Sequence, residues 1–191
     1  MPQTDDSVRI NELRLVWVDL EMTGLDVTKD VILEIAVIIT GPDLQPIDQF
    51  HSIVHQPELL IASMIPLVRE MHTKNGLIDR VRAATSTLKD AEAGALACVK
   101  RHIPAGQGVL AGNSIHVDRM FLRRHMPRFE EYLHYRQVDV SSIKVLSRAW
   151  YPDLPRVEKP EKDHTALSDI RASIAELAHY RAELFKKSEQ G

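Results

Sequence analysis

One segment constrains the fold more than any other, because residues 13–20, LRLVWVDL, are almost continuously apolar. A strand in the middle of a sheet that is covered on both faces needs such a run. The run leads into Asp19-Leu20-Glu21, and side chains two positions apart on a strand point to the same face. The sequence therefore predicts a buried central strand with Leu15, Trp17, Asp19 and Glu21 on one face, and Val16, Val18 and Leu20 on the other.

The rest of the pattern predicts an α/β fold. Strands are expected at residues 31–40 and, more weakly, at residues 49–55, with a hairpin-type connection over residues 23–30. From residue 78 onward, apolar residues recur every three to four positions, as amphipathic helices require. The expected helices cover residues 88–103, 114–124, 141–150 and 167–184, with short strands at residues 108–112 and 137–140. Early strands followed by alternating helices and strands indicate a mixed sheet.

Chain length and composition limit the class of protein. The 191 residues fit one globular domain, and we expect it over residues 13–185, between flexible ends at residues 1–12 and 186–191. The proline-rich residues 152–163 predict a mobile surface loop. A single cysteine, Cys98, excludes an internal disulfide framework and fits a reducing compartment. No apolar run approaches the ~20 residues that span a bilayer, and the first residues do not resemble a secretory signal, so we expect a cytoplasmic protein without membrane contact.

Charge narrows the possible partners. The net charge of −3, from 24 Lys+Arg and 27 Asp+Glu, argues against binding long duplexes through many phosphate contacts. A short nucleic acid or a small phosphate ester is compatible with it. Positive charge is concentrated in residues 119–136, which hold five arginines and two glutamates. This segment is either a solvated helix face or an anion-binding patch.

Two predicted segments carry acidic residues at positions that need a partner. Asp19 and Glu21, at the end of a buried strand, repel each other unless protons or a cation neutralise them, and a hard divalent metal is the natural solution. A pair of exposed acids at a strand end is the alternative. Asp118 lies on the apolar stripe of its predicted helix with Ile115 and Leu122, so it needs an interior partner. That partner is either the same metal site or an arginine.

The third candidate segment is the start of the last predicted helix, where His164 precedes Asp169. Alone, the two residues are typical of an exposed histidine and a helix-start acid. Together with the other three carboxylates they supply the parts of two-metal phosphodiester hydrolysis, in which carboxylates hold two cations and a histidine deprotonates water. Oxygen ligands favour Mg²⁺ or Mn²⁺ over Zn²⁺.

Four segments carry a resemblance to a known family: VDLEMTGLD, GNSIHVDRMFL, HYRQVDVSS and HTALSDI, at residues 18–26, 112–122, 134–142 and 164–170. They resemble the oligoribonuclease family, in the DEDDh branch of the ribonuclease H-like 3′-to-5′ exonucleases, over about residues 13–185 and in the same order. The resemblance implies a ribonuclease H-like mixed sheet flanked by helices. It also implies an obligate homodimer that removes nucleotides from the 3′ end of very short RNAs, dinucleotides above all.

The resemblance assigns roles to individual residues. Asp19, Glu21, Asp118 and Asp169 match the family's four metal-binding carboxylates, and His164 matches its general base. The substrate-binding matches are Leu25 and His72 at the bases, Ser114, Arg136 and Ser141 around the 5′ phosphate, and Tyr135, which in the family reaches into the active site of the other subunit. The alternative is that Leu25 and Tyr135 are core residues and Arg136 is a surface charge.

One position departs from the family pattern. Where the family has a Trp that wedges against a base, this chain has Leu67. Base stacking contributes roughly 1–3 kcal/mol per base. The pocket therefore either binds the base less tightly or is rebuilt by neighbours such as Met64 or Met71.

The sequence as a whole predicts a metal-dependent 3′-to-5′ exoribonuclease that hydrolyses short oligoribonucleotides, especially dinucleotides, to nucleoside 5′-monophosphates. One alternative is a DEDDh exonuclease that acts on longer RNA or DNA ends; the modest charge and the phosphate-capping residues weigh against it. The other alternative is a catalytically silent oligonucleotide-binding module. The presence of all five catalytic positions weighs against that reading.

Overall fold

A computed structural model describes the protein over residues 13–157 and 165–185. The predicted flexible ends, His164 and the second half of the predicted loop at residues 152–163 lie outside these ranges. The strands that the structure describes form one mixed sheet in the order β3-β2-β1-β4-β5. Their bounds are Arg14–Met22 (β1), Ile32–Thr40 (β2), Pro46–Ile53 (β3), Gly108–Gly112 (β4) and Gln137–Asp139 (β5). As predicted, β1 is central: it pairs antiparallel with β2 and parallel with β4.

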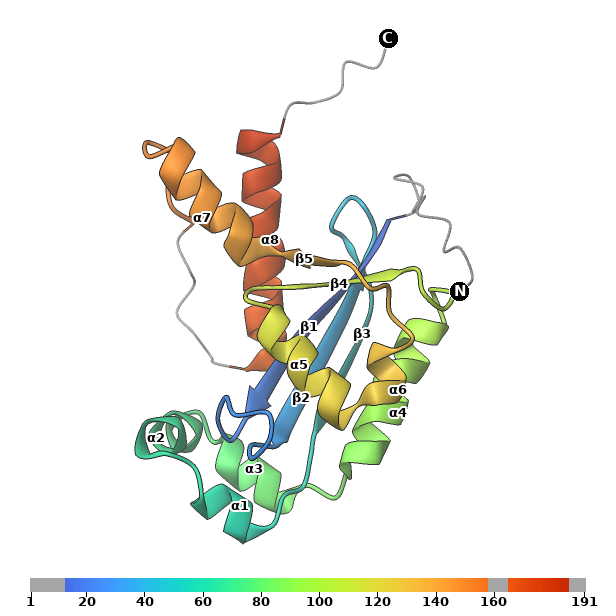
Figure 1. Cartoon of the computed structure of the whole chain (residues 1–191), viewed down its shortest axis with the longest axis vertical. Helices are drawn as coiled ribbons and strands as arrows, with labels where there is room; N and C mark the ends of the chain where they lie inside the picture. Colours follow the sequence, from blue (N-terminus) through green and yellow to red (C-terminus); the bar gives the residue numbers. More distant parts are fainter. Residues whose placement is uncertain (1–12, 158–164, 186–191) are drawn as a thin grey trace.

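Helices cover the sheet on both faces and at one end (Figure 1). Their bounds are Glu58–Ala62 (α1), Pro66–Lys74 (α2), Leu77–Ala83 (α3), Leu88–Lys100 (α4), His116–His125 (α5), Pro127–Glu130 (α6), Val140–Trp150 (α7) and Ala166–Leu184 (α8). Among these helices none combines the length and the apolar character needed to cross a membrane. The predicted α/β class, with a mixed sheet flanked by helices, is confirmed.

Two apolar cores lie on opposite faces of the sheet, and the side chains of β1 alternate between them. Val16, Val18 and Leu20 pack in the core that includes residues of α4, α5 and α6. Leu15 and Trp17 pack in the core that includes residues of α7 and α8. The predicted alternation along the strand is therefore confirmed, and it directs Asp19 and Glu21 to the face that α8 covers.

The prediction was incomplete between residues 46 and 83. Strand β3 begins three residues earlier than expected, and helices α1, α2 and α3 were not predicted. These helices are short, and α1 and α2 each bury one residue, Ile61 and His72. A helix that buries one side chain shows no apolar stripe in its sequence. Ile61 packs with Leu77 and Val81 of α3 in a third, smaller core at this end of the sheet.

Candidate active site

Three carboxylates meet where β1 ends. Asp19 and Glu21 come from β1, and Asp169 comes from the first turn of α8. One carboxylate oxygen from each lies within 4.8 Å of the other two. A capping box between Thr165 and Ser168 fixes the first turn of α8. The helix dipole also favours a negative charge in that turn.

Asp118 reaches the same strand end from α5. Its side chain is buried, and its Oδ1 accepts a hydrogen bond of 3.0 Å from the backbone N–H of Leu20. The predicted burial on the stripe with Ile115 and Leu122 is confirmed, since all three are buried. The interior partner in the structure is the end of β1, between Asp19 and Glu21.

The electrostatics of this end of the sheet favour a cation. Burial, then repulsion from Glu34 and Asp169, raises the pKa of Glu21 to about 7. Burial raises the pKa of Asp118 to about 7. Burial and the nearby carboxylates Asp118 and Glu21 hold the pKa of Asp19 well above its ordinary value. Each shift means that negative charge is disfavoured here, and a bound cation would remove that cost. The alternative of an exposed acidic pair is wrong.

The sequence reasoning missed Glu34, a fully buried acid on β2. It lies directly opposite Glu21 in the β1–β2 register, where like charges destabilise a sheet. His51 Nε2 lies 2.6 Å from one Glu34 oxygen, and Arg80 Nη2 lies 3.7 Å from the other. These two contacts stabilise the buried Glu34 carboxylate, whereas Glu21 faces the carboxylate cluster. A glutamate within the otherwise apolar run ILEIAVII was the available signal.

His72 joins α2 to the end of β1. Its Nε2 lies 2.9 Å from the carbonyl oxygen of Met22, and its Nδ1 lies 3.9 Å from Glu21 Oε2. Because a carbonyl oxygen only accepts, Nε2 carries the proton and the Nδ1 lone pair faces the carboxylate. Burial lowers the pKa of His72 and so favours this neutral form. The structure thus places His72 next to the carboxylate cluster.

Leu25 lies in a hydrogen-bonded loop that presents it to solvent. Thr23 Oγ1 donates to Asp30 Oδ1 at 2.8 Å, and the N–H of Asp26 donates to Asp30 Oδ2 at 2.8 Å. Gly24 lets the loop close around that carboxylate, because an added Cβ would lie 2.5 Å from Asp30 Oδ2. Leu25 is 74% exposed, so the alternative that it is a core residue is wrong.

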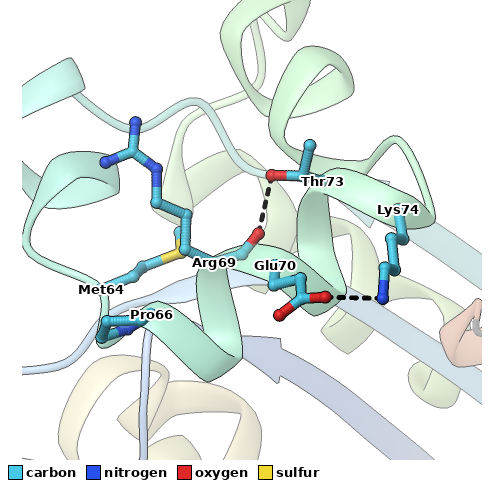
Figure 2. Close-up of a pocket in the computed structure, with 6 residues that line it drawn as sticks. All are labelled: Met64, Pro66, Arg69, Glu70, Thr73 and Lys74. Atoms are coloured by element: carbon cyan, nitrogen blue, oxygen red, sulfur yellow. Dashed lines mark hydrogen bonds and ion pairs between the residues drawn. The ribbon is translucent and has the colours of Figure 1, made fainter.

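Leu67 is also exposed, unlike the buried His72 on the same helix. Met71, one turn later, is partly exposed, whereas Met64 is buried in the third core. Of the two neighbours considered for rebuilding the base pocket, only Met71 therefore presents its side chain at the surface. Helix α2 also borders a hollow of about 550 Å³ that contains none of the predicted site residues (Figure 2). It is lined by Met64, Pro66, Arg69, Glu70, Thr73 and Lys74.

The predicted phosphate-binding serines are brought together, although they lie on different elements. Ser114 follows β4, Ser141 lies in the first turn of α7, and their hydroxyl oxygens are 3.2 Å apart. The N–H of Ser114 donates to Ser141 Oγ at 3.0 Å and to Asp139 Oδ1 at 2.9 Å. Ser114 has a φ of 52°, a left-handed conformation that is uncommon for non-glycine residues.

Tyr135 and Arg136 lie next to each other in the loop before β5. Tyr135 is 58% exposed, so it is not a core residue. Its ring stacks on His134, and the Arg136 guanidinium lies 5.4 Å from its centroid. The buried Arg119 holds this loop by donating to the carbonyl oxygens of His134 and Arg136.

Arg119 and Arg123 belong to the arginine-rich segment, residues 119–136, which was expected to be either a solvated helix face or an anion-binding patch. Both donate to Glu130, and the buried Arg119 is neither solvated nor free to bind an anion. The segment is therefore partly structural, which neither sequence interpretation foresaw.

Comparisons with known proteins define the class. Residues 16–177 match the family model described as exonuclease (RNase T). An oligoribonuclease of Paracidovorax citrulli is 46% identical over 91% of this chain and 91% of its own. An oligoribonuclease of Pseudomonas aeruginosa is 46% identical over 92% of this chain and 98% of its own. The mitochondrial oligoribonuclease of Mus musculus is 48% identical over 91% of this chain and 74% of its own.

Solved structures agree on the fold. Exonuclease I of Methylocaldum szegediense matches with a TM-score of 0.67 at 22% identity, over 90% of this chain and 41% of that one. Exonuclease I of E. coli, in complex with a 5cy-dT13 oligonucleotide, matches with a TM-score of 0.67 at 16% identity. This chain spans 41% of that exonuclease I chain, so the likeness concerns the fold alone.

The fold and the carboxylate cluster define a nuclease of the exonuclease family, and the chain belongs to that family. Its relatives place it, more closely, among the oligoribonucleases, which are 3′-to-5′ exoribonucleases of short oligoribonucleotides.

Proposed function

We propose that this chain hydrolyses short oligoribonucleotides, dinucleotides in particular, from the 3′ end to nucleoside 5′-monophosphates. The observation that carries the proposal is the cluster of Asp19, Glu21 and Asp169, whose oxygens lie within 4.8 Å of one another. The names of the relatives supply the substrate class.

The cluster suits two divalent cations, Mg²⁺ or Mn²⁺, held by Asp19, Glu21, Asp118 and Asp169. All the donors are carboxylate oxygens, which hard cations prefer. When bound, such cations would polarise the phosphate, lower the pKa of water and stabilise the charge that develops on the leaving oxygen.

The protein supplies the position of the carboxylates and the general base. The Asp118 carboxylate is fixed by the N–H of Leu20, and the Asp169 carboxylate by the first turn of α8. His164 takes the proton of the attacking water in this proposal. It lies outside the described residues, so its role rests on the resemblance and on its position just before Thr165, the N-cap of α8.

Exposed apolar and polar side chains suit a short substrate. Leu25 and Leu67 offer apolar surface for the bases, and Met71 adds to it. Ser114 and Ser141, with Arg136, form what we term the phosphate cap. A cap on the 5′ phosphate ends the binding groove, which would favour dinucleotides over longer chains.

We include a homodimer in the proposal. Val145, Leu146 and Trp150 are large apolar residues of α7 that remain exposed, and Tyr151 follows them. Such a patch is typical of an interface, and most soluble oligomers are symmetric homo-oligomers. The second copy would also bring Tyr135 to the partner's site. The expectations of a single domain and a cytoplasmic location belong to the same proposal.

Hydrolysis of two substrates by the purified protein tests the function. A 5′-phosphorylated dinucleotide and a longer single-stranded RNA are compared, with Mn²⁺ and with EDTA. We expect fast, metal-dependent cleavage of the dinucleotide and slow trimming of the longer RNA. Equal or faster cleavage of the longer RNA would support the exonuclease for longer ends, and failure to cleave either would support the silent binding module.

A further inference from the structure

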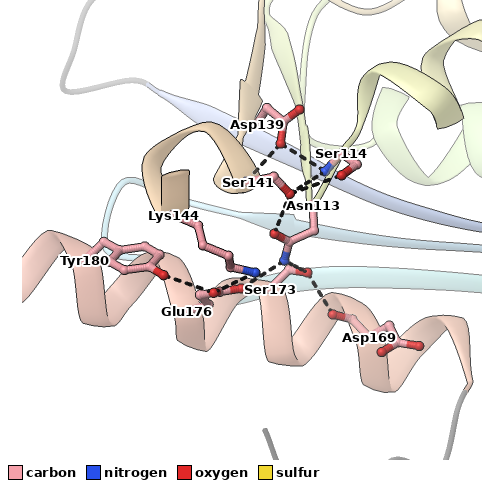
Figure 3. Close-up of polar contacts among 9 residues, drawn as sticks. All are labelled: Asn113, Ser114, Asp139, Ser141, Lys144, Asp169, Ser173, Glu176 and Tyr180. Atoms are coloured by element: carbon pink, nitrogen blue, oxygen red, sulfur yellow. Dashed lines mark hydrogen bonds and ion pairs between the residues drawn. The ribbon is translucent and has the colours of Figure 1, made fainter. Parts of the chain in front are cut away.

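A chain of polar contacts joins the phosphate cap to the helix that carries Asp169 (Figure 3). Asn113, the residue after β4, lies in the middle of this series of contacts. Its Oδ1 accepts from Ser141 Oγ at 3.0 Å, and its Nδ2 donates to Ser173 Oγ at 2.9 Å. Ser173 Oγ in turn donates to the backbone carbonyl oxygen of Asp169 at 2.9 Å. The cap and the metal-binding helix therefore share one side-chain bridge.

Glu176 fixes which way the Asn113 amide points. This buried carboxylate lies on α8, and its Oε2 accepts from Asn113 Nδ2 at 3.2 Å. Lys144 and Tyr180 bind its other oxygen, at 2.8 and 3.1 Å. A carboxylate only accepts hydrogen bonds, so the amide must present its NH₂ group to Glu176 and its oxygen to Ser141.

The fixed amide determines where the hydroxyl proton of Ser141 goes. A serine hydroxyl has one proton, and in this arrangement Ser141 donates it to Asn113. The Ser141 oxygen meanwhile accepts from the N–H of Ser114. Ser141 has no second proton to offer, so Ser114 is the donor in the 3.2 Å contact between the two hydroxyls, and its proton can turn to a phosphate instead. Phosphate oxygens accept hydrogen bonds, so the two serines are not equivalent towards a phosphate.

We propose that Asn113 is a positioning residue for the phosphate cap: it takes the proton of Ser141, leaves Ser114 as the serine that donates to the 5′ phosphate, and holds the cap at a fixed separation from Asp169. The inference rests on the proposed function, because it presumes that the cap binds a 5′ phosphate. It adds that the preference for short substrates depends on a residue that touches neither the phosphate nor a metal ligand's carboxylate.

Two dinucleotides of the same sequence, one with and one without a 5′ phosphate, test the proposal. The wild-type protein should prefer the phosphorylated one. In Asn113→Ala, kcat/KM for the phosphorylated dinucleotide should fall about tenfold, mainly through KM, because a hydrogen bond to a charged group is lost or misdirected. For the dinucleotide without the phosphate, kcat/KM should stay close to wild type. A general structural defect would lower both values together.

Two further variants keep the test decisive. Tyr180→Phe removes a contact of Glu176 at the end away from Asn113, and should keep the wild-type preference. Ser173→Ala removes one of the two contacts of the Asn113 NH₂ group with little change in volume, and should weaken the preference in the same direction as Asn113→Ala. If Asn113→Ala does not fold, as thermal unfolding would reveal, Ser173→Ala decides.

Each remaining outcome is informative. An unchanged preference in folded Asn113→Ala, together with its loss in Ser114→Ala, would overturn the role of Asn113 and leave the cap standing. An equal fall for both dinucleotides in Asn113→Ala would reduce Asn113 to a structural residue. A wild-type protein that does not distinguish the two dinucleotides would overturn the cap and this inference together, while leaving the exoribonuclease activity untouched.

Discussion

In the proposed metal site, Asp19 contributes to catalysis at a cost to the stability of the metal-free protein. Asp19→Asn removes a ligand whose cations stabilise the transition state by several kcal/mol, so activity should fall about a thousandfold. The same change removes a charge that burial and Asp118 disfavour. In EDTA the variant should therefore unfold at a higher temperature, by roughly 2–4 °C for each kcal/mol of relieved repulsion.

Asp79→Asn is the matched control, because Asp79 is exposed and lies outside the cluster. It should change neither activity nor, by more than about 0.5 kcal/mol, stability. Normal activity in Asp19→Asn would remove Asp19 from the site, and a lower melting temperature in EDTA would contradict the electrostatic account.

The raised pKa values predict how metal binding depends on pH. Glu21 and Asp118 each have a pKa of about 7 in the folded protein. The unfolded chain releases these protons near its ordinary pKa of about 4, so the stability of the metal-free protein falls as pH rises from there to about 7. A cation needs the deprotonated form, so it should stabilise the protein more at about pH 8 than at about pH 5.5.

The measurement is the melting temperature with Mg²⁺ minus that with EDTA, across this pH range. Groups remote from the cluster affect both series and cancel in the difference. A difference that stays constant with pH would show that these carboxyls do not bind the cation.

Helices α4 and α8 both begin with a capping box, but only the first turn of α8 carries a residue of the carboxylate cluster, Asp169. Thr165 caps α8 and Thr87 caps α4, each in a capping box. Replacing either with alanine should cost about 1 kcal/mol of stability. Thr165→Ala should also raise the metal concentration needed for half-maximal activity, because the first turn of α8 holds Asp169.

Thr87→Ala serves as the control for this prediction, since α4 packs in the core on the other face of the sheet. It should lower the melting temperature by a similar amount without changing the metal dependence. An equal shift in metal dependence for both variants would indicate a general loss of stability instead.

For the whole molecule, the proposed dimer depends on the exposed face of α7. Trp150→Glu places a charge in this apolar patch. Loss of a Trp at the centre of an interface costs about 2 kcal/mol or more, so the dissociation constant of the dimer should rise roughly 30-fold. Sedimentation equilibrium measures this change, and activity should fall with the dimer if Tyr135 serves the partner's site.

Leu59→Glu provides the comparison, because Leu59 is an exposed apolar residue of α1 rather than α7. It should leave the association state unchanged. A wild-type protein that is monomeric at all concentrations, or a Trp150→Glu variant that dimerises as tightly as wild type, would contradict the proposed interface.

Where the chain itself carries a periodic or local signal, the sequence was sufficient. The apolar run before Asp19 predicted a buried central strand, and alternation along it placed Asp19 and Glu21 on one face with Leu15 and Trp17. In the structure α8 covers that face. The stripe shared with Ile115 and Leu122 predicted the burial of Asp118. These signals are strong because burial of a whole element requires many apolar residues at a fixed spacing.

Only the tertiary structure decided contacts between residues far apart in the chain. Glu34 faces Glu21 because of strand register, and His51 and Arg80 reach Glu34 from β3 and α3. No sequence pattern distinguishes Asn113 from other polar residues. Only the fold shows that it lies between Ser141 and α8. Helices α1 and α2, which bury one residue each, left no stripe to detect. The roles of Glu34 and Asn113 depend on contacts with residues distant in sequence. Those contacts are set by tertiary packing, which no local sequence pattern predicts.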